Sequence, residues 1–287
     1  MVKVKFVATA LTTGVHNYTK TLHSFGYDYE HLALGEKWGG WRFRMKTYMD
    51  ICKKEKPDEI LILTDADDVL VTRKNDNLQT IFEKFNKDII VSSETVCLTS
   101  TCKDIPNYWK KNGKEDSSCF FVNCGLMMGR AGELCTMWKW MLDQGFQDDQ
   151  IALGHYVDSY PEKFHVDAYN ELFYTVPRST SVEIEWSKNE LVSLIDPIDK
   201  RKCTPYFLHF AGHFTIPTIH SALVLHKQPV LYDDIAKKIL NTEAMSYQNL
   251  NEGGRKYGIL IFWTITSIFL VIIILLAIFL TKKRTKK

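Results

Sequence analysis

The chain has 287 residues, with 36 Lys and Arg, 34 Asp and Glu, and a formal net charge of +2. Five of the basic residues lie in the last six positions, 282–287, which leaves 31 basic against 34 acidic residues before them. The part before these six positions is thus slightly acidic and has no basic and aromatic patch, so it is not expected to bind nucleic acid. The length suits one large α/β domain with a short appendage.

Strand-like apolar runs alternate with helical patterns along most of the chain, which predicts an α/β domain with a mainly parallel mixed sheet. The first elements expected are strands at Val4–Ala8, Tyr29–Leu34, Glu59–Thr64 and Asp88–Ser92, and helices at His16–Phe25, Phe43–Lys54 and Leu78–Phe85. The polar stretch Thr95–Ser118 contains Pro106 and predicts a long surface loop or lid. Core structure is then expected to resume at Phe120–Asn123, followed by a helix at Leu134–Leu142 and short strands between Phe164 and Phe210.

Residues 257–281 contain no charged side chain. The 23 residues from Gly258 to Leu280 would form a helix about 34 Å long, enough to cross a bilayer with a small tilt. A buried core helix is disfavoured because every face is apolar and Tyr257 and Trp263 lie near one end, as interface anchors do. We therefore predict a domain at 1–230, an amphipathic helix (about Ile235–Ala244) and linker within 231–256, a transmembrane helix at 257–281 and a basic tail at 282–287.

The orientation of this single-pass anchor is predicted less directly. The apolar stretch at the start of the chain is too short for a secretory signal, and the seven cysteines contain no CxxC pair, so neither a zinc site nor a disulfide framework is indicated. These features favour a cytosolic domain, whereas the positive-inside rule would place the basic tail in the cytosol. The sequon Asn17-Tyr18-Thr19 offers a test, because glycosylation of Asn17 would reverse the predicted orientation.

An acidic run follows the most apolar of the predicted strands. Asp65, Asp67 and Asp68 come directly after Ile60–Thr64. Three carboxylates so close together repel one another unless a cation lies among them. At the carboxyl end of a buried strand they predict a Mg²⁺ or Mn²⁺ site beside a phosphate, as in enzymes that use a nucleotide or nucleotide-sugar. The alternative is that these residues cap a helix or face water, as Asp-rich turns often do.

Seven short segments of the chain share a pattern with a known family: 6–14, 32–40, the acidic run at 65–68, Ser92-Ser93-Glu94, 122–125, 148–150 and 209–212. In this order they resemble the glycosyltransferase domain of procollagen lysyl hydroxylases and procollagen galactosyltransferases. The resemblance extends roughly over residues 4–213 and implies a Rossmann-like glycosyltransferase fold of the GT-A type. It also implies a UDP-sugar donor and a Mn²⁺ (or Mg²⁺) cofactor.

The resemblance also implies roles for individual residues. It matches Asp65, Asp68 and His209 to the metal ligands of the family. A His with two Asp is a plausible ligand set for Mn²⁺. The cofactor-binding residues implied are Thr9 and Trp38 at the nucleotide, Arg42 at the diphosphate, Asp65 and Gly212. The catalytic residues implied, near the transferred sugar, are Asn123, Asp149 and Asp148, although Trp38 can instead fill the core and Asp148 can instead cap a helix that begins near Gln150.

The chain departs from the family pattern at several of these positions. Asp67 replaces an aromatic residue, which weakens the implied choice of uridine and leaves an Asp65/Asp67 pair open as the metal ligands. The glycine-rich segment expected after Gly40 is shortened, Cys124 replaces a Ser, and Phe-Ala-Gly follows His209 in place of Gly-Asn-Gly. No dioxygenase segment follows in this sequence, so lysine hydroxylation is not implied.

Two functions remain open from the sequence. The first is a membrane-anchored, metal-dependent glycosyltransferase that moves galactose or glucose from a UDP-sugar to a hydroxyl group of a protein or glycan, with hydroxylysine of a collagen-like protein as the acceptor that the family implies. The second is a catalytically inactive, glycosyltransferase-like membrane or virion scaffold, which the shortened loop and Asp67 would suit. A metal-dependent phosphohydrolase or nuclease is a weaker third reading.

Overall fold

The computed structural model describes residues 2–9, 15–66, 68–95, 102–113, 121–176, 183–187, 190–196, 198 and 200–211. These residues belong to one structural unit, Met1–Val230. Several sequence predictions lie outside the described residues: those for Asp67, Gly212, the amphipathic helix and linker within 231–256, the transmembrane segment at 257–281 and the basic tail at 282–287. Within the described part of the chain, no helix has the length and apolar character needed to cross a membrane.

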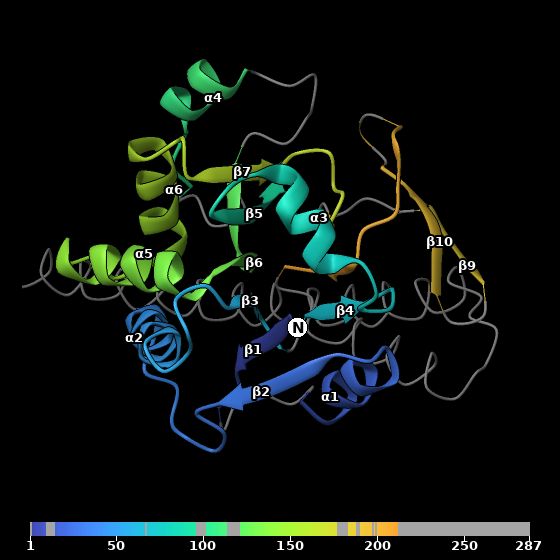
Figure 1. Ribbon diagram of the computed structural model, residues 1–287, viewed down its shortest axis with the longest axis horizontal. Helices are drawn as coiled ribbons and strands as arrows, with labels where there is room; N and C mark the ends of the chain where they lie inside the picture. Colours follow the sequence, from blue (N-terminus) through green and yellow to red (C-terminus); the bar gives the residue numbers. More distant parts are fainter. Residues whose placement is uncertain are drawn as a thin grey trace, which may run out of the picture. The chain divides into compact units, whose positions relative to one another are not determined.

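A six-stranded mixed sheet forms the centre of the domain, in the order β2-β1-β3-β6-β5-β7 (Figure 1). Strand β1 is parallel to β2 and β3, and β5 is parallel to β7, whereas β6 runs antiparallel to both β3 and β5. The predicted mainly parallel mixed sheet is confirmed. The strands are β1 (Lys3–Val7), β2 (Asp28–Leu32), β3 (Ile60–Thr64), β5 (Ile89–Glu94), β6 (Phe121–Arg130) and β7 (Phe164–Asp167).

Helices cover both faces of this sheet, which explains why its central strands are apolar on both sides. Leu61 and Leu63 of β3 pack in one core cluster with α2, α5 and α6, whereas Ile60 and Ile62 pack in a second cluster with α1 and α3. Figure 1 shows α2, α5 and α6 on one side of the sheet and α1 and α3 on the other. The helices are α1 (Val15–Ser24), α2 (Trp41–Cys52), α3 (Leu78–Phe85), α4 (Pro106–Asn112), α5 (Ala131–Asp143) and α6 (Asp149–Ser159).

Three expectations need correction. The stretch expected to be a loop between Thr95 and Ser118 contains α4, which begins at Pro106 and packs against α6. Proline suits a first helical turn, where its missing N–H is not needed, and Asp158 of α6 accepts hydrogen bonds from the next two backbone N–H groups, at 2.7 and 3.3 Å. The core segment expected at Phe120–Asn123 is the start of a longer strand, β6, which continues to Arg130. Cys102 is disulfide-bonded, although the cysteine spacing gave no sign of it.

A small three-stranded sheet, in the order β4-β12-β8, lies beside the central one. Its strands are β4 (Val69–Val71), β8 (Phe173–Thr175) and β12 (Phe207–His209), and a third sheet contains β9 (Glu183–Ser187), β10 (Glu190–Ile195) and β11 (Lys202–Cys203). Strand β12 is antiparallel to β4, with His209 opposite Val69. The backbone N–H of Phe210 also donates to the carbonyl of Asp68 at 2.8 Å. This pairing places the end of β12 next to the acidic run.

The buried carboxylate of Asp167 shapes the turn that leads from β7 into β8. It accepts hydrogen bonds from the backbone N–H groups of Glu171, Leu172 and Phe173, each at 2.8 Å. The hydroxyl of Ser93 donates to the backbone carbonyl of Asp167 at the same distance. Because β8 pairs with β12, this turn supports the strand that carries His209.

We expect Asp167→Asn to lower the free energy of unfolding by about 1–3 kcal/mol. Both carboxylate oxygens accept N–H groups, so the NH₂ group of an asparagine would face at least one backbone donor in either orientation. Chemical denaturation measures the change, with Asp143→Asn as a control because Asp143 is exposed and pairs only with Lys139 of its own helix among the contacts observed. Equal unfolding energies for the two variants would contradict this account of the turn.

Candidate metal and donor site

Three of the predicted residues come together at the carboxyl end of β3. Asp65 follows β3, Asp68 precedes β4, and His209 ends β12. Their ligand atoms lie within 4.8 Å of one another, and the Nε2 atom of His209 is 3.4 Å from Asp68 Oδ2 and 3.6 Å from Asp65 Oδ2. The structure therefore assembles the Asp-Asp-His group that the sequence suggested.

The imidazole of His209 is buried and faces two carboxylates without forming a well-aligned hydrogen bond to either. Its side chain is 3% exposed, and neither ring nitrogen has a hydrogen-bond partner within the described part of the chain. A buried polar atom without a partner is costly. Burial alone would lower the pKa of His209, but the carboxylates of Asp68 and Asp65 raise it. Two carboxylates facing an imidazole suit Mn²⁺ or Mg²⁺, so the residues present fit the metal that the resemblance implies.

Gly125 of β6 lies directly against the imidazole. A Cβ atom at this position would be 2.2 Å from Cε1 of His209 and 2.8 Å from its Nε2. The carbonyl of Gly125 accepts a hydrogen bond from the N–H of Asp65 at 2.8 Å. The pairing of β5 with β6 shifts register between Val91 and Ser92, opposite this part of β6, and such irregularities often occur beside active sites. Glycine is thus required here by the close approach of His209.

Arg44 of α2 connects Asp65 to Asp149. Its Nη1 forms an ion pair with Asp65 Oδ1, and its Nε lies 2.5 Å from Asp149 Oδ2. Its guanidinium also lies over the ring of Trp41, 4.8 Å from the centroid. Burial raises the pKa of Asp65 to about 6, with the charge of Arg44 opposing and that of Asp68 adding to the shift. Burial likewise raises the pKa of Asp149 against the effect of Arg44.

A second polar network lies beside this one and includes Asn123. Its Nδ2 donates to Glu94 Oε2 at 3.0 Å, and its Oδ1 accepts from the N–H of Gly125 at 2.8 Å. Gln150 donates to Glu94 Oε1 at 2.9 Å and accepts from the N–H of Cys124 at 2.7 Å. Three of the short segments, around 92–94, 122–125 and 148–150, are therefore joined by hydrogen bonds at one end of the sheet.

The other predicted site residues have different positions. Asp148 caps α6, because its carboxylate accepts a hydrogen bond from the N–H of Ile151 at 3.0 Å. Arg42 is exposed, and its Nη1 and Nη2 donate to the carbonyls of Phe146 and Leu142 at 3.1 and 3.4 Å. The capping alternative for Asp148 is confirmed, while its catalytic role and the diphosphate contact of Arg42 stay predictions.

The two residues expected at the nucleotide follow neighbouring strands. Thr9 is buried just after β1, and Trp38 lies in the loop after β2. Trp38 is half-buried and packs edge-on against Trp41 and Phe43, with ring centroids 5.1 and 6.2 Å away. Strands β1 and β2 run parallel to β3, so both residues lie at the same end of the sheet as Asp65.

Sequence reasoning missed Arg44 and gave no role to Glu94 or Gln150. A signal for Arg44 was available, because Arg44, Tyr48 and Ile51 share the buried face of α2 at the i, i+4, i+7 spacing. A charged residue on that face must meet a buried partner. The resemblance implies a role for Arg42 instead, which lies only two positions before Arg44. Side chains two positions apart on a helix point to nearly opposite faces, so Arg42 is exposed and Arg44 is buried.

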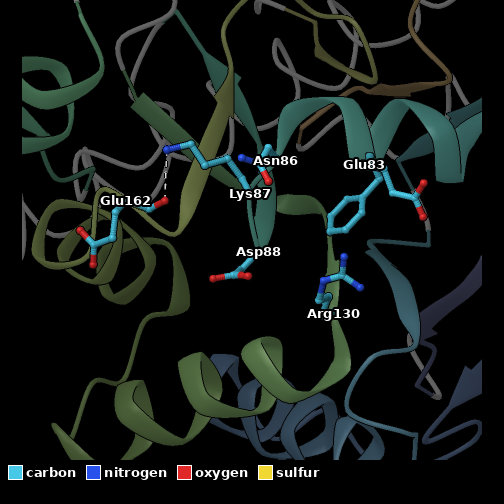
Figure 2. Close-up of a pocket in the computed structure, with 7 residues that line it drawn as sticks. Glu83, Asn86, Lys87, Asp88, Arg130 and Glu162 are labelled. Atoms are coloured by element: carbon cyan, nitrogen blue, oxygen red, sulfur yellow. Dashed lines mark hydrogen bonds between the residues drawn. The ribbon is translucent and has the colours of Figure 1, made fainter.

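A separate depression of about 180 Å³ lies at the other end of the central sheet (Figure 2). Asp88 and Glu162 on its wall come just before the parallel strands β5 and β7. Figure 2 shows Lys87 reaching the backbone carbonyl of Glu162, a hydrogen bond of 3.1 Å. Ligands of open α/β sheets bind at the carboxyl ends of strands, so we do not assign this depression to the site.

Comparison with known proteins agrees with this geometry. The family model described as the PLOD GT domain matches residues 1–209, a range that includes Asp65, Asp68 and His209. The chain belongs to this family of glycosyltransferase domains. The resemblance seen in the short segments is therefore confirmed, and the fold is that of an α/β glycosyltransferase.

Individual relatives match this PLOD-type glycosyltransferase domain more distantly. The procollagen-lysine,2-oxoglutarate 5-dioxygenase of Drosophila melanogaster is 29% identical over 150 residues, which cover 47% of this chain and 20% of that protein. The match thus spans only a fifth of the relative's length. Among solved structures, a glycosyltransferase involved in the glycosylation of the major capsid of PBCV-1 matches at 13% identity and a TM-score of 0.43, over 78% of this chain and 99% of that one.

We expect Gly125→Ala to weaken Mn²⁺ binding about 10-fold or more, because the new methyl group would displace the imidazole of His209. Isothermal calorimetry with Mn²⁺ and UDP measures the affinity. Cys124→Ala is the matched control, since it changes the neighbouring buried residue of β6 without adding a Cβ atom. Unchanged affinity in a folded Gly125→Ala protein would show that His209 is not needed at the ion.

Proposed function

We propose that this chain is a metal-dependent glycosyltransferase that transfers a hexose, galactose or glucose, from a UDP-sugar to a hydroxyl acceptor. The observation that carries the proposal is the convergence of Asp65, Asp68 and the buried imidazole of His209 at the carboxyl end of the sheet. In a member of a glycosyltransferase-domain family, this is where a donor diphosphate and its ion are expected. By analogy with the family, the acceptor we propose is hydroxylysine of a collagen-like protein.

The proposed roles of the residues follow from their positions. Asp65, Asp68 and His209 would hold Mn²⁺ or Mg²⁺, which when bound supplies positive charge for the departing diphosphate. Thr9 and Trp38, after β1 and β2, would line the nucleotide pocket, with Arg42 and Gly212 as further predicted contacts. Asn123 and Asp149 would face the transferred sugar, with Asn123 oriented by its hydrogen bond to Glu94.

The membrane part of the proposal rests on sequence alone. The transmembrane helix at 257–281 and its basic tail remain predictions. The side of the membrane on which the domain lies is also a prediction, and two features of the chain disagree about it. The sequence favoured the cytosol, whereas a disulfide at Cys102 is more typical of an oxidising compartment.

Modification of Asn17 decides the orientation. We expect Asn17 to stay unmodified in cells, as for a cytosolic domain. The measurement is the mass of the chain before and after treatment with an N-glycosidase, in the wild type and in Asn17→Gln. A glycosidase-sensitive shift that disappears in Asn17→Gln would place the domain on the opposite side of the membrane.

Activity tests the proposed function directly. The full chain in detergent, with Mn²⁺ and UDP-galactose or UDP-glucose, should release UDP and glycosylate a hydroxylysine-containing peptide. Asp68→Asn should lower kcat/KM roughly 100-fold or more, because it removes an anionic ligand from the ion that balances the leaving charge. Asp143→Asn, which alters an exposed carboxylate of α5, is the control and should keep wild-type activity.

The scaffold alternative makes the opposite prediction about ligand binding. A catalytically inactive scaffold should show no metal-dependent binding of UDP by calorimetry. If the folded wild type neither binds UDP with Mn²⁺ nor transfers sugar from either donor, the transferase proposal is wrong and the scaffold reading is favoured.

A further inference from the structure

The buried guanidinium of Arg44 contacts three side chains at this end of the sheet. Arg44 is 5% exposed, and three different groups surround its guanidinium: the carboxylates of Asp65 and Asp149 and the ring of Trp41. Burial of an arginine is costly unless its charge is paired. Two carboxylates raise its pKa further above the usual range, although burial opposes them. Arg44 is therefore a fixed positive charge in the site.

The two oxygens of Asp65 have different environments as a result. Oδ1 pairs with Nη1 of Arg44, whereas Oδ2 faces Nε2 of His209 at 3.6 Å. Since Arg44 engages Oδ1 and Oδ2 faces His209, Oδ2 is the oxygen of Asp65 that is placed to bind an ion together with His209. A carboxylate held in this way can bind an ion through one oxygen in a fixed orientation.

We propose that Arg44 is a positioning residue that ties the metal carboxylate Asp65 to the sugar-side carboxylate Asp149. It presents Oδ2 of Asp65 to the ion and sets the distance between the ion and the transferred sugar. This assignment rests on the proposed function and extends it to a residue outside the expected ligand and substrate contacts. Partners of metal ligands commonly change metal affinity or activity 10- to 100-fold when they are removed.

The geometry requires arginine at this position. Nε and Nη1 belong to one planar group, so they can meet two carboxylates at once in a fixed relation. A lysine ammonium is a point charge on a flexible chain and would not hold Asp65 and Asp149 in the same relation. Arg44 also offsets one of the three negative charges of Asp65, Asp68 and Asp149 before an ion binds, and a divalent ion can offset the remainder.

The experiment compares Arg44→Ala and Arg44→Lys with the wild type, using full-length chains in detergent. Lys46→Ala is the control, because Lys46 is exposed on the same helix. Mn²⁺ binding is measured by electron paramagnetic resonance with UDP present and no acceptor, and kcat and KM are measured separately with UDP-hexose. Thermal unfolding checks that each variant is folded.

We expect Arg44→Ala to weaken Mn²⁺ binding 10- to 100-fold, to alter the spectrum of the bound ion and to lower kcat more than it raises KM for the donor. Millimolar methylguanidinium should restore binding and turnover in Arg44→Ala by occupying the vacated space. Arg44→Lys keeps the positive charge, but we expect it to restore neither Mn²⁺ binding nor turnover. It serves as the test variant if Arg44→Ala does not fold. Lys46→Ala should match the wild type throughout.

Two results would overturn the assignment while leaving the proposed function intact. One is an active wild type with a folded Arg44 variant that binds Mn²⁺ and turns over normally. The other is a loss in the Arg44 variants that follows unfolding alone and does not respond to methylguanidinium. A wild type without Mn²⁺-dependent UDP binding or sugar transfer would instead overturn the proposed function, and this assignment with it.

Discussion

The antiparallel pairing of β12 with β4 is the constraint on which the rest of the site depends. It places His209 opposite Val69 and the N–H of Phe210 on the carbonyl of Asp68, so residues far apart in the sequence share one corner. The pairing also brings two carboxylates and an imidazole out of water, which is unfavourable unless the charges are balanced. The fold supplies one part of that balance through Arg44, and the proposed divalent cation would supply the remainder.

Strand β6 connects the two halves of the site. Because it runs antiparallel between β3 and β5, it carries both Gly125, which lies against His209, and Asn123, which joins the network of Glu94 and Gln150. The absence of a side chain at Gly125 lets the imidazole of His209 approach the backbone. The side-chain amides of Asn123 and Gln150 each donate a hydrogen bond to one oxygen of the buried Glu94 carboxylate. One strand therefore orients groups on the proposed metal side and on the proposed sugar side.

The sequence predicted the elements well where hydrophobic periodicity controls the structure, as in β3, α2 and α3. It failed at α4, where a polar stretch becomes a short helix through Pro106 and the cap from Asp158, a contact between distant segments. The metal group was predictable only in part: the spacing showed the acidic run, but His209 entered through the order of family segments. No local pattern could reveal that β12 pairs with β4, because sheet pairing is a property of the tertiary fold.

The sequence could not show which of two neighbouring residues of the same type lies in the candidate site. Arg42 and Arg44 differ in helical phase, so one lies on the exposed face against the end of α5 and the other is buried between carboxylates. Asp148 and Asp149 differ in a similar way, since the first caps α6 and the second begins it and meets Arg44. In both pairs a shift of one or two positions changes the contacts of the side chain, through the helical phase for the arginines and through the start of α6 for the aspartates.

The ion pair with Arg44 also bears on what Asp149 can do. A carboxylate at the sugar can either hold hydroxyl groups or accept the proton of the acceptor. Protonation of Asp149 would leave Arg44 with one partner fewer in a buried environment, which costs free energy, even though burial raises the pKa of Asp149. The ion pair suits the proposed role in which Asp149 would hold sugar hydroxyls through the oxygen not bonded to Nε of Arg44.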